Sequence, residues 1–285
     1  SLTWTQMPAA LGTIAEGVFS IAFNPLNANV VYAGGDMSGL FRSTDRGASW
    51  TQTSLAIPPL VTFGTNKIVI DASDTSRIYV GTSAGLWISD DDGGTWMTTT
   101  AIDTINGISI GALVVIPQTP DTVLVASTGS AGVFRSLDRA GSWAPANNGI
   151  TDTDVTGMVV SPAVTGLIVV STDGGGVFRS TDSGGSWTAA NTGIGNLGLA
   201  SVAISPSNPI VLYAGSLTGE IYESTDSGVN WNNITFALAN ANPVNAIAVH
   251  PDSAHITYIG IDNVYRLRQS GLDSISFLTT NTQIS

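Results

Sequence analysis

Short apolar runs, separated by turns rich in glycine and aspartate, follow one another along the whole chain. One type of run is apolar at nearly every position and ends at a proline or an acidic turn. Short apolar runs bounded by turn residues and rich in Val and Ile predict β-strands, and near-continuous ones favour strands buried on both faces. We place these first strands at 18–23, 67–70, 110–116, 155–160, 199–204 and 244–249.

Two further apolar runs follow each first strand, and a polar eight-residue segment, here called the octet, then leads into a tryptophan. The octets read STDRGASW, SDDDGGTW, SLDRAGSW, STDSGGSW and STDSGVNW, and they end at Trp50, Trp96, Trp143, Trp187 and Trp231. They recur 44 to 47 residues apart. A near-constant period of this length predicts stacked supersecondary units.

The residue types of the octet suit a tight turn between two strands. Asp and Ser side chains accept hydrogen bonds from main-chain N–H groups a few residues ahead, and Gly adopts the positive φ that such turns need. We therefore interpret the octet aspartates as structural and the tryptophans as packing residues that begin a fourth strand. The aspartates are Asp45, Asp91, Asp138, Asp182 and Asp226.

The repeats predict an all-β fold, a six-bladed β-propeller of four-stranded antiparallel blades. Six sets of three strands are present, but only five internal tryptophans begin a fourth strand. Because Trp4-Thr5-Gln6 matches Trp50-Thr51-Gln52, we expect the N-terminal strand to close the ring. Residues 272–285 are an alternative outer strand or a frayed tail. We expect one domain, 1–285, with blades at about 18–53, 66–99, 110–146, 155–190, 199–234 and 244–278, the last completed by 1–7.

The octet resembles the Asp-box, or bacterial neuraminidase repeat, over nearly the whole chain. Proteins with this repeat include sialidases, xyloglucan-degrading endoglucanases, sortilin-like receptors and photosystem II assembly factors. The resemblance implies the propeller and leaves the function open, because one fold carries many activities.

Composition removes several classes of function. Nine Lys and Arg against 21 Asp and Glu give a net charge of −12, so we expect no nucleic-acid partner. Cysteine is absent, which excludes disulfides and cysteine-ligated zinc. The sequence contains no run of eighteen apolar residues, so we expect no membrane insertion. We expect no cofactor and a monomer that is secreted, periplasmic or on the cell surface, with its signal missing from this sequence.

Aspartates 90–92 are a conceivable calcium cluster, but no second ligand segment is evident, so we expect no metal site. Asp91 belongs to the octet turn, and we expect the carboxylates on either side of it to be solvated.

Resemblance to sialidases implies three arginines that converge on a substrate carboxylate, together with a Tyr–Glu pair. Here Arg42, Arg135, Arg179 and Arg266 share one repeat position on the third strand. Residues at one repeat position lie at one radius, so we expect these side chains to pair with neighbouring blades. Sialidase activity is not expected.

Two carboxylates in loops between second and third strands are the candidate catalytic residues. Asp36 and Asp173 both precede the glycine that opens the third strand. The sequence Tyr-Ala-Gly-Gly-Asp ending at Asp36 resembles the Tyr-Ala-Arg-Thr-Asp stretch of xyloglucan-degrading endoglucanases, in which that Asp is catalytic. Those enzymes use two propellers, whereas one is expected here. The simpler interpretation is that Asp suits a Gly-rich turn. Asp262, in a shorter loop, is a third candidate, for binding.

Two long loops, 53–65 and 98–109, carry apolar residues that suggest a binding surface. The equal alternative is that they cover the mouth of the central channel. The residues concerned are Pro58, Pro59, Phe63 and Ile102. We expect a non-catalytic propeller that binds a protein or polysaccharide through its inter-blade loops. The alternative is a glycoside hydrolase, xyloglucanase-like or endoglucanase-like or a module of one, that uses Asp36 and Asp173.

Overall fold

The computed structural model describes residues 17–35, 39–53, 64–98, 105, 107–119, 121–235, 242–261, 264–268 and 276–277. Within these ranges all regular structure is β, and there is no helix. The strands form six four-stranded antiparallel sheets. The protein is therefore an all-β, six-bladed β-propeller, which confirms the predicted fold class.

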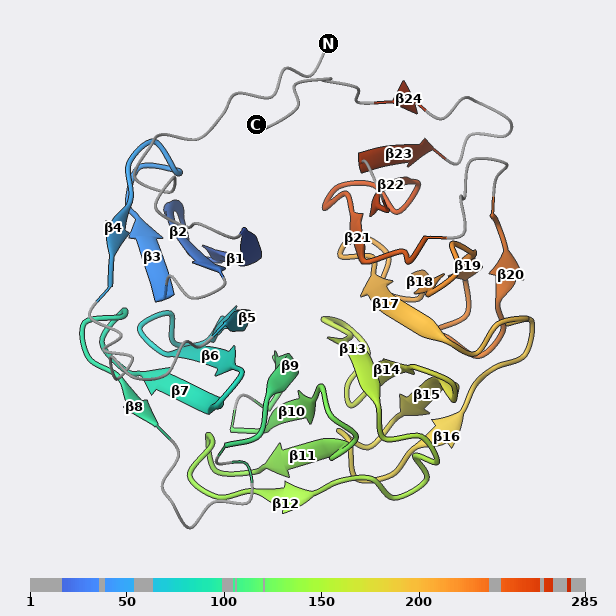
Figure 1. Cartoon of the computed structure of the whole chain (residues 1–285), viewed down its shortest axis with the longest axis horizontal. Coiled ribbons are helices and arrows are strands. Elements are labelled where there is room, and N and C mark those ends of the chain that lie inside the picture. Colours follow the sequence, from blue (N-terminus) through green and yellow to red (C-terminus); the bar gives the residue numbers. More distant parts are fainter. Residues whose placement is uncertain are drawn as a thin grey trace. The chain divides into compact units, whose positions relative to one another are not determined.

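The chain divides into two compact units, and the first, residues 1–146, contains three blades. Each blade is a meander in which consecutive strands pair, and the first strands β1, β5 and β9 lie side by side (Figure 1). The strands are β1 (Val18–Asn24), β2 (Asn27–Gly35), β3 (Gly39–Ser43), β4 (Thr51–Gln52), β5 (Thr65–Ile70), β6 (Ile78–Thr82), β7 (Gly85–Ser89), β8 (Met97–Thr98), β9 (Ile110–Val115), β10 (Val123–Ser127), β11 (Val133–Ser136) and β12 (Ala144–Pro145).

The second unit, residues 147–285, repeats this arrangement in three more blades. The strands are β13 (Val155–Val160), β14 (Ile168–Thr172), β15 (Gly176–Ser180), β16 (Thr188–Ala189), β17 (Leu199–Ile204), β18 (Leu212–Ser216), β19 (Ile221–Ser224), β20 (Asn232–Asn233), β21 (Ala246–Val249), β22 (Ile256–Gly260), β23 (Val264–Arg268) and β24 (Ser276–Phe277). All six predicted first strands agree with the structure to within two residues at each end.

The sixth blade takes its fourth strand from the C-terminal part of the chain. Tyr265 of β23 pairs with Phe277 of β24, and Arg266 pairs with Ser276. This is the edge of β23 that the sequence assigned to residues 4–6, which lie outside the described residues. In the structure β24 occupies this edge instead. The pairing therefore supports the alternative in which residues 272–285 supply an outer strand.

Second strands, not first strands, are the most deeply buried. Every residue of β6, β10, β14 and β18 is buried, whereas buried and partly exposed residues alternate along β17. The expectation that the first strands are buried on both faces fits β9, where five of six residues are buried, and is wrong for β17. A second strand has a neighbour on each side, whereas the first strand is the inner edge of its blade and keeps one side open.

Blades within a unit pack face to face in a repeated way. Tyr32 and Leu40, from the second and third strands of blade one, pack against Ile68 and Ile70 on the first strand of blade two. In blade five, Tyr213 of the second strand likewise packs near blade six. We call the face that carries the Tyr32 and Leu40 positions the rear face of a blade, and the face that carries the Ile68 and Ile70 positions its front face.

The octets close the turn between the third and fourth strands with the same hydrogen bonds each time. In the first, the Ser43 hydroxyl donates to Asp45 Oδ1 (2.8 Å), and the main-chain N–H groups of Gly47 and Ser49 donate to Ser43 Oγ (2.8 Å) and Asp45 Oδ1 (2.7 Å). The residue after the aspartate has a positive φ, 61° at Arg46. The other four octets repeat this pattern at Asp91, Asp138, Asp182 and Asp226.

Candidate functional site

The end of the blades opposite the octets, here called the loop side, is built in the second unit by three connections joined through main-chain hydrogen bonds. Asp173 N donates to Asp154 O (3.0 Å), which joins the β14–β15 turn to the segment before β13. Gly174 N and Gly176 N both donate to Leu197 O (3.1 and 2.9 Å), which joins the same turn to the segment before β17. Asp173 is therefore held on a turn that is fixed from both sides.

The carboxylates on this surface differ in what they contact. Asp152 accepts from Asp154 N at Oδ1 (3.1 Å) and from Gly175 N at Oδ2 (2.7 Å), so both of its oxygens hold the main chain. Asp173 is exposed and Asp154 is half-buried. Within the described residues no hydrogen bond or ion pair engages either of these two side chains. An ionised carboxylate is an acceptor only, so both are available to donors on a ligand.

Next to Asp173 lies a polar cluster around Glu220. Asn196 Nδ2 donates to Glu220 Oε2 (3.3 Å), and the Thr218 hydroxyl donates to the same oxygen (2.6 Å), as does Ser216. Partial burial opposes the charge on Glu220, but these hydrogen bonds outweigh it and lower the pKa of the carboxyl group. Glu220 is thus a fixed negative charge.

The cluster and Asp173 belong to one surface. A Cβ atom at Gly198 would lie 3.5 Å from both Asn196 Oδ1 and Asp173 Oδ1. We call the set Asp154, Asp173, Asn196, Thr218 and Glu220 the loop-side polar surface. The sequence singled out only Asp173 of these. Asp154 and Asn196 lie in loops after fourth strands, and a polar residue in a loop carries no signal until the strand register brings the loops together.

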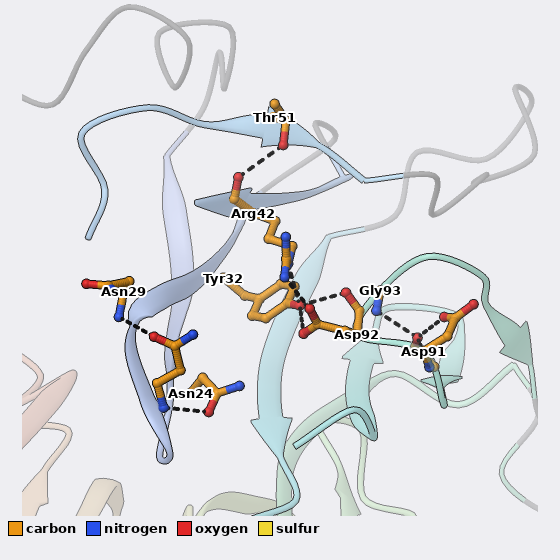
Figure 2. A network of polar contacts seen from close by, with 10 residues as sticks. Asn24, Asn29, Tyr32, Arg42, Thr51, Asp91, Asp92 and Gly93 are labelled. Carbon is orange, nitrogen blue, oxygen red and sulfur yellow. Dashed lines mark hydrogen bonds and ion pairs between the residues drawn. The ribbon is translucent and has the colours of Figure 1, made fainter. Parts of the chain in front are cut away.

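A second polar network joins blades one and two in the first unit. Figure 2 shows Arg42 of β3 and Tyr32 of β2 both reaching Asp92, in the octet turn before β8. Arg42 Nε donates to the Tyr32 oxygen (2.9 Å), and the Tyr32 hydroxyl lies 2.8 Å from both Asp92 O and Asp92 Oδ1. Burial, with the neighbouring Asp92 charge, raises the pKa of Tyr32, so the phenol stays protonated.

The carboxylates beside Asp91 are engaged by arginine and also remain in contact with solvent, since their side chains are 48% exposed at Asp90 and 39% exposed at Asp92. Asp92 pairs with Arg42, and Asp90 pairs with Arg77. Within the described residues no group of three or more His, Cys, Asp or Glu side chains is arranged to hold a metal ion.

Arginines act between blades rather than converging on one point. Arg179 Nε donates to Ser227 O (2.9 Å), in the octet turn of the next blade, and Arg77 NH2 donates to Arg139 O (2.6 Å), also one blade on. With Arg42, these side chains each hold a neighbouring octet turn. For Arg42 and Arg179 this is the use expected from the shared repeat position, and Arg77 acts in the same way although the repeat did not predict it.

The tryptophans that end the octets are packed against the blades. Trp50, Trp143, Trp187 and Trp231 are buried, and Trp231 Nε1 donates to Ala190 O of the preceding blade (3.0 Å). Trp96 is partly buried beside blade one. None of the five is presented as a flat exposed platform of the kind that stacks on a sugar.

Several predicted site residues lie outside the described residues: Asp36, Asp262, Pro58, Pro59, Phe63 and Ile102. Ile105, from the second of the long apolar loops, is described and is fully buried in the core between blades two and three. That side chain therefore contributes to packing. No helix among the described residues is long and apolar enough to cross a membrane.

No protein-family model matches the sequence, and no curated protein sequence matches it either. Solved β-propellers do match in three dimensions. An ancestral GH74 enzyme is similar with a TM-score of 0.75 at 21% identity, over 92% of this chain and 38% of the enzyme. The extracellular domain of a hybrid two-component system from B. thetaiotaomicron gives 0.72 at 14% identity, over 94% of this chain and 34% of that one. YCF48 bound to D1 peptide gives 0.66 at 16% identity, over 90% and 79%.

These likenesses establish the propeller fold and no more, because all three identities are low. This chain spans well under half the length of the first two proteins.

Proposed function

We propose that this chain is a non-catalytic, secreted or cell-surface propeller that binds a protein or polysaccharide partner through its inter-blade loops. In the second unit the contact is the loop-side polar surface. The observation that carries the proposal is the pair Asp154 and Asp173. Their carboxylates are without a described partner, although the main chain beneath them is fixed by hydrogen bonds to Leu197 and Asp154.

The surface suits a partner that presents hydrogen-bond donors. Asp154, Asp173 and the fixed charge of Glu220 supply acceptors, and the chain is acidic overall, at −12. Acceptors held in place before binding lose little conformational freedom when a ligand arrives. A sugar hydroxyl or an amide or basic group of a protein would serve as the donor. The structural neighbours include YCF48 in complex with a peptide, and an extracellular domain, which supports partner binding outside the cell.

The geometry around Asp173 argues against acid–base catalysis at this site. A general acid for glycoside hydrolysis is held in a shielded, apolar position, and a second carboxylate stands ~5–10 Å away. Asp173 is exposed rather than shielded; of the carboxylates near it, Asp152 uses both oxygens to hold main-chain N–H groups, and Asp154 is open like Asp173. Arg42, Arg77 and Arg179 each hold an octet turn and are not gathered into a site for an acidic sugar.

The test of binding uses a charge-removing substitution and a matched control in the same unit. Asp173→Asn and Asp154→Asn should each weaken retention on a glycan array or on an immobilised protein partner at least tenfold. Asp252→Asn removes the same charge from an exposed turn on the octet side and should change nothing. Retention that Asp252→Asn lowers as much as Asp173→Asn would show that net charge, not this surface, governs binding.

A hydrolase that uses Asp36 and Asp173 is the second candidate, favoured by the fold likeness to a GH74 enzyme. It predicts turnover of xyloglucan that either Asp36→Asn or Asp173→Asn abolishes. We expect little or no turnover of xyloglucan and none of sialyl-lactose. Turnover lost in either variant would replace the binding proposal with this one.

A further inference from the structure

Gly198 lies on the loop side of the second unit, between the turns of blades four and five. It pairs with Asp173 in an isolated antiparallel bridge, and its carbonyl oxygen accepts from Leu217 N (2.9 Å). One blade earlier the equivalent residue is Asp154, whose carbonyl oxygen accepts from Asp173 N (3.0 Å) in the same way. The junction at Gly198 is therefore made entirely by residues of one unit, and it has a glycine where the preceding junction has a side chain.

Three side chains surround the space that a side chain on Gly198 would occupy. Among the described residues, the atoms nearest to a Cβ atom there would be Asp173 Oδ1, Asn196 Oδ1 and Leu217 Cδ1, each at 3.5 Å. A separation of 3.5 Å is an ordinary van der Waals contact, so a group the size of a methyl fits without displacing its neighbours. We call this space, bounded by two acceptor oxygens and one apolar group, the Gly198 cradle.

The two oxygens of the cradle have acceptor capacity left for a ligand. Asn196 Nδ2 donates to Glu220 Oε2 (3.3 Å), which holds the amide so that its Oδ1 faces Gly198. That oxygen accepts one hydrogen bond, from Gly198 N (3.0 Å), and a carbonyl oxygen has two lone pairs. The carboxylate of Asp173 is exposed and keeps all of its acceptor sites, as described above.

The negative charge of this surface is not compensated by a described cation. Every ion pair among the described residues lies in the first unit. Asp173 and Glu220 therefore leave an unbalanced charge beside the cradle. The cradle is complementary to a small group that is positively charged and carries more than one hydrogen-bond donor.

We propose that the Gly198 cradle binds the ammonium group of a lysine side chain on a protein partner. The inference rests on the proposed function, because it names the chemical group that the loop-side polar surface recognises. An ammonium group is close to a methyl in size and has three donors and no acceptor, so it can donate to Asp173 Oδ1 and Asn196 Oδ1 at once. Its hydrogen bond to the carboxylate is charge-assisted and stronger than one between neutral groups.

The apolar residues at the cradle favour a protein partner over a polysaccharide. Leu217 Cδ1 forms one wall, and Leu197, next to Gly198 in sequence, is 39% exposed. The methylene groups of a lysine side chain pack on apolar surface of this kind while the charged end is held by polar atoms. The octet tryptophans, by contrast, are packed against the blades and present no face on which a sugar ring could stack.

The test follows the main-chain amide signals of the isotope-labelled chain by NMR while a capped peptide of leucine, lysine and leucine is added. The signals of Gly198 and Thr218 should shift and saturate. Added salt should weaken binding, because it screens the attraction between the ammonium and carboxylate groups. The same peptide with an acetylated lysine has lost its charge and should give no saturable shift.

Gly198→Ala is the most specific variant, because it fills the cradle and leaves every charge in place. Gly198 and Gly195 both lack a positive φ, so the backbone accepts alanine at either position. Gly198→Ala and Asp173→Asn should each weaken peptide binding roughly tenfold or more. Gly195→Ala is the matched control in the same loop, since the nearest described atom to its Cβ would be the Tyr222 hydroxyl oxygen, at 3.8 Å. It should bind like the native chain.

Three results would overturn the proposal: a native chain without a saturable shift, equal binding of the acetylated peptide, or unchanged binding by Gly198→Ala. A thermal melt establishes that each variant is folded, and if Gly198→Ala is not, Asp173→Asn and the acetylated peptide decide. A glucosamine tetramer that moves the same signals at lower concentration than the peptide would overturn the choice of a protein partner.

Failure of the cradle and failure of the proposed function give different results. Partner retention that Asp173→Asn lowers and Gly198→Ala does not would remove the cradle and leave the proposed function in place. Retention that neither variant changes, although peptide binding depends on both, would contradict the proposed function instead.

Discussion

Asp173 lies on the turn before β15 and Asp182 lies on the turn after it, in the same blade. The two carboxylates differ in whether hydrogen-bond donors surround them. Asp182 accepts from the Ser180 hydroxyl (2.8 Å), Ser186 N (2.9 Å) and the Ser186 hydroxyl (2.6 Å). Asp173 is followed by three glycines, whose N–H groups at 174 and 176 donate instead to Leu197 O. Donors two residues before and four residues after the octet aspartate occupy its carboxylate oxygens. The loop-side aspartate is left with its acceptors open.

The comparison teaches that the neighbours of a carboxylate, and not its presence in a turn, decide whether it is structural or available. In the octets, serine, threonine or asparagine residues at fixed offsets donate hydrogen bonds to the aspartate oxygens. Glycines bring no side-chain donor, so the turn is fixed by main-chain contacts while the carboxylate faces solvent.

The largest effect is expected on the octet side, from Trp187→Ala. Trp187 is buried, and its main-chain N donates to Asn148 O (2.8 Å). Removing a buried indole should lower the free energy of unfolding by ~3–5 kcal/mol. Urea denaturation measures the change through the midpoint at constant slope. A loss below ~1 kcal/mol would mean that the octet tryptophan is not a core residue.

Gly149→Ala tests how tightly the loop side is joined to the octet side. Gly149 has φ 95°, and a Cβ there would lie 2.0 Å from the Trp187 carbonyl oxygen. The backbone must shift, so we expect a loss of about 1–3 kcal/mol in the free energy of unfolding. Gly129→Ala is the control, since its Cβ would have no atom nearer than 3.9 Å. Equal losses in both variants would contradict the close contact.

Asp182→Asn tests the octet carboxylate through pH. Partial burial opposes the charge, but the hydrogen bonds from Ser186 and Ser180 outweigh it and lower the pKa of Asp182 to about 2. An unfolded Asp titrates near ~3.9, so the stabilisation is present above about pH 4 and is lost as pH falls toward about 2.

The variant should be about 1 kcal/mol less stable at pH 7, similar to the loss of a helix-capping side chain. Its stability curve should approach that of the native chain as pH falls toward 2, because Asp182 becomes protonated over this range. Chemical denaturation at several pH values measures both curves. A difference that stays constant down to pH 2 would show that the charge is not what the turn uses.

The smallest effect on stability is expected from Asp173→Asn. Because no described contact depends on this carboxylate, the free energy of unfolding should change by less than ~0.5 kcal/mol. The same variant should lose partner binding as described above. A stability loss as large as that of Asp182→Asn would remove the contrast between the two turns.

Much of the fold is encoded in local residue order. The octets and the apolar runs are self-contained signals, because each serine, aspartate and glycine acts on partners within four residues. The first strands and the turns before Trp50 and Trp187 could therefore be located from the sequence. The use of Arg42 and Arg179 on neighbouring blades followed from their shared repeat position.

What only the tertiary structure decided are the contacts between residues far apart in the chain. Asp92 is bound by Arg42, fifty residues earlier, and Asp154 and Asp173 meet through a main-chain hydrogen bond between separate loops. The fourth strand of blade six came from Ser276–Phe277, although Trp4 matched the octet pattern better. The local sequence pattern indicates which kind of side chain a residue can pack against. Whether such a side chain lies beside it is determined only by how the blades pack.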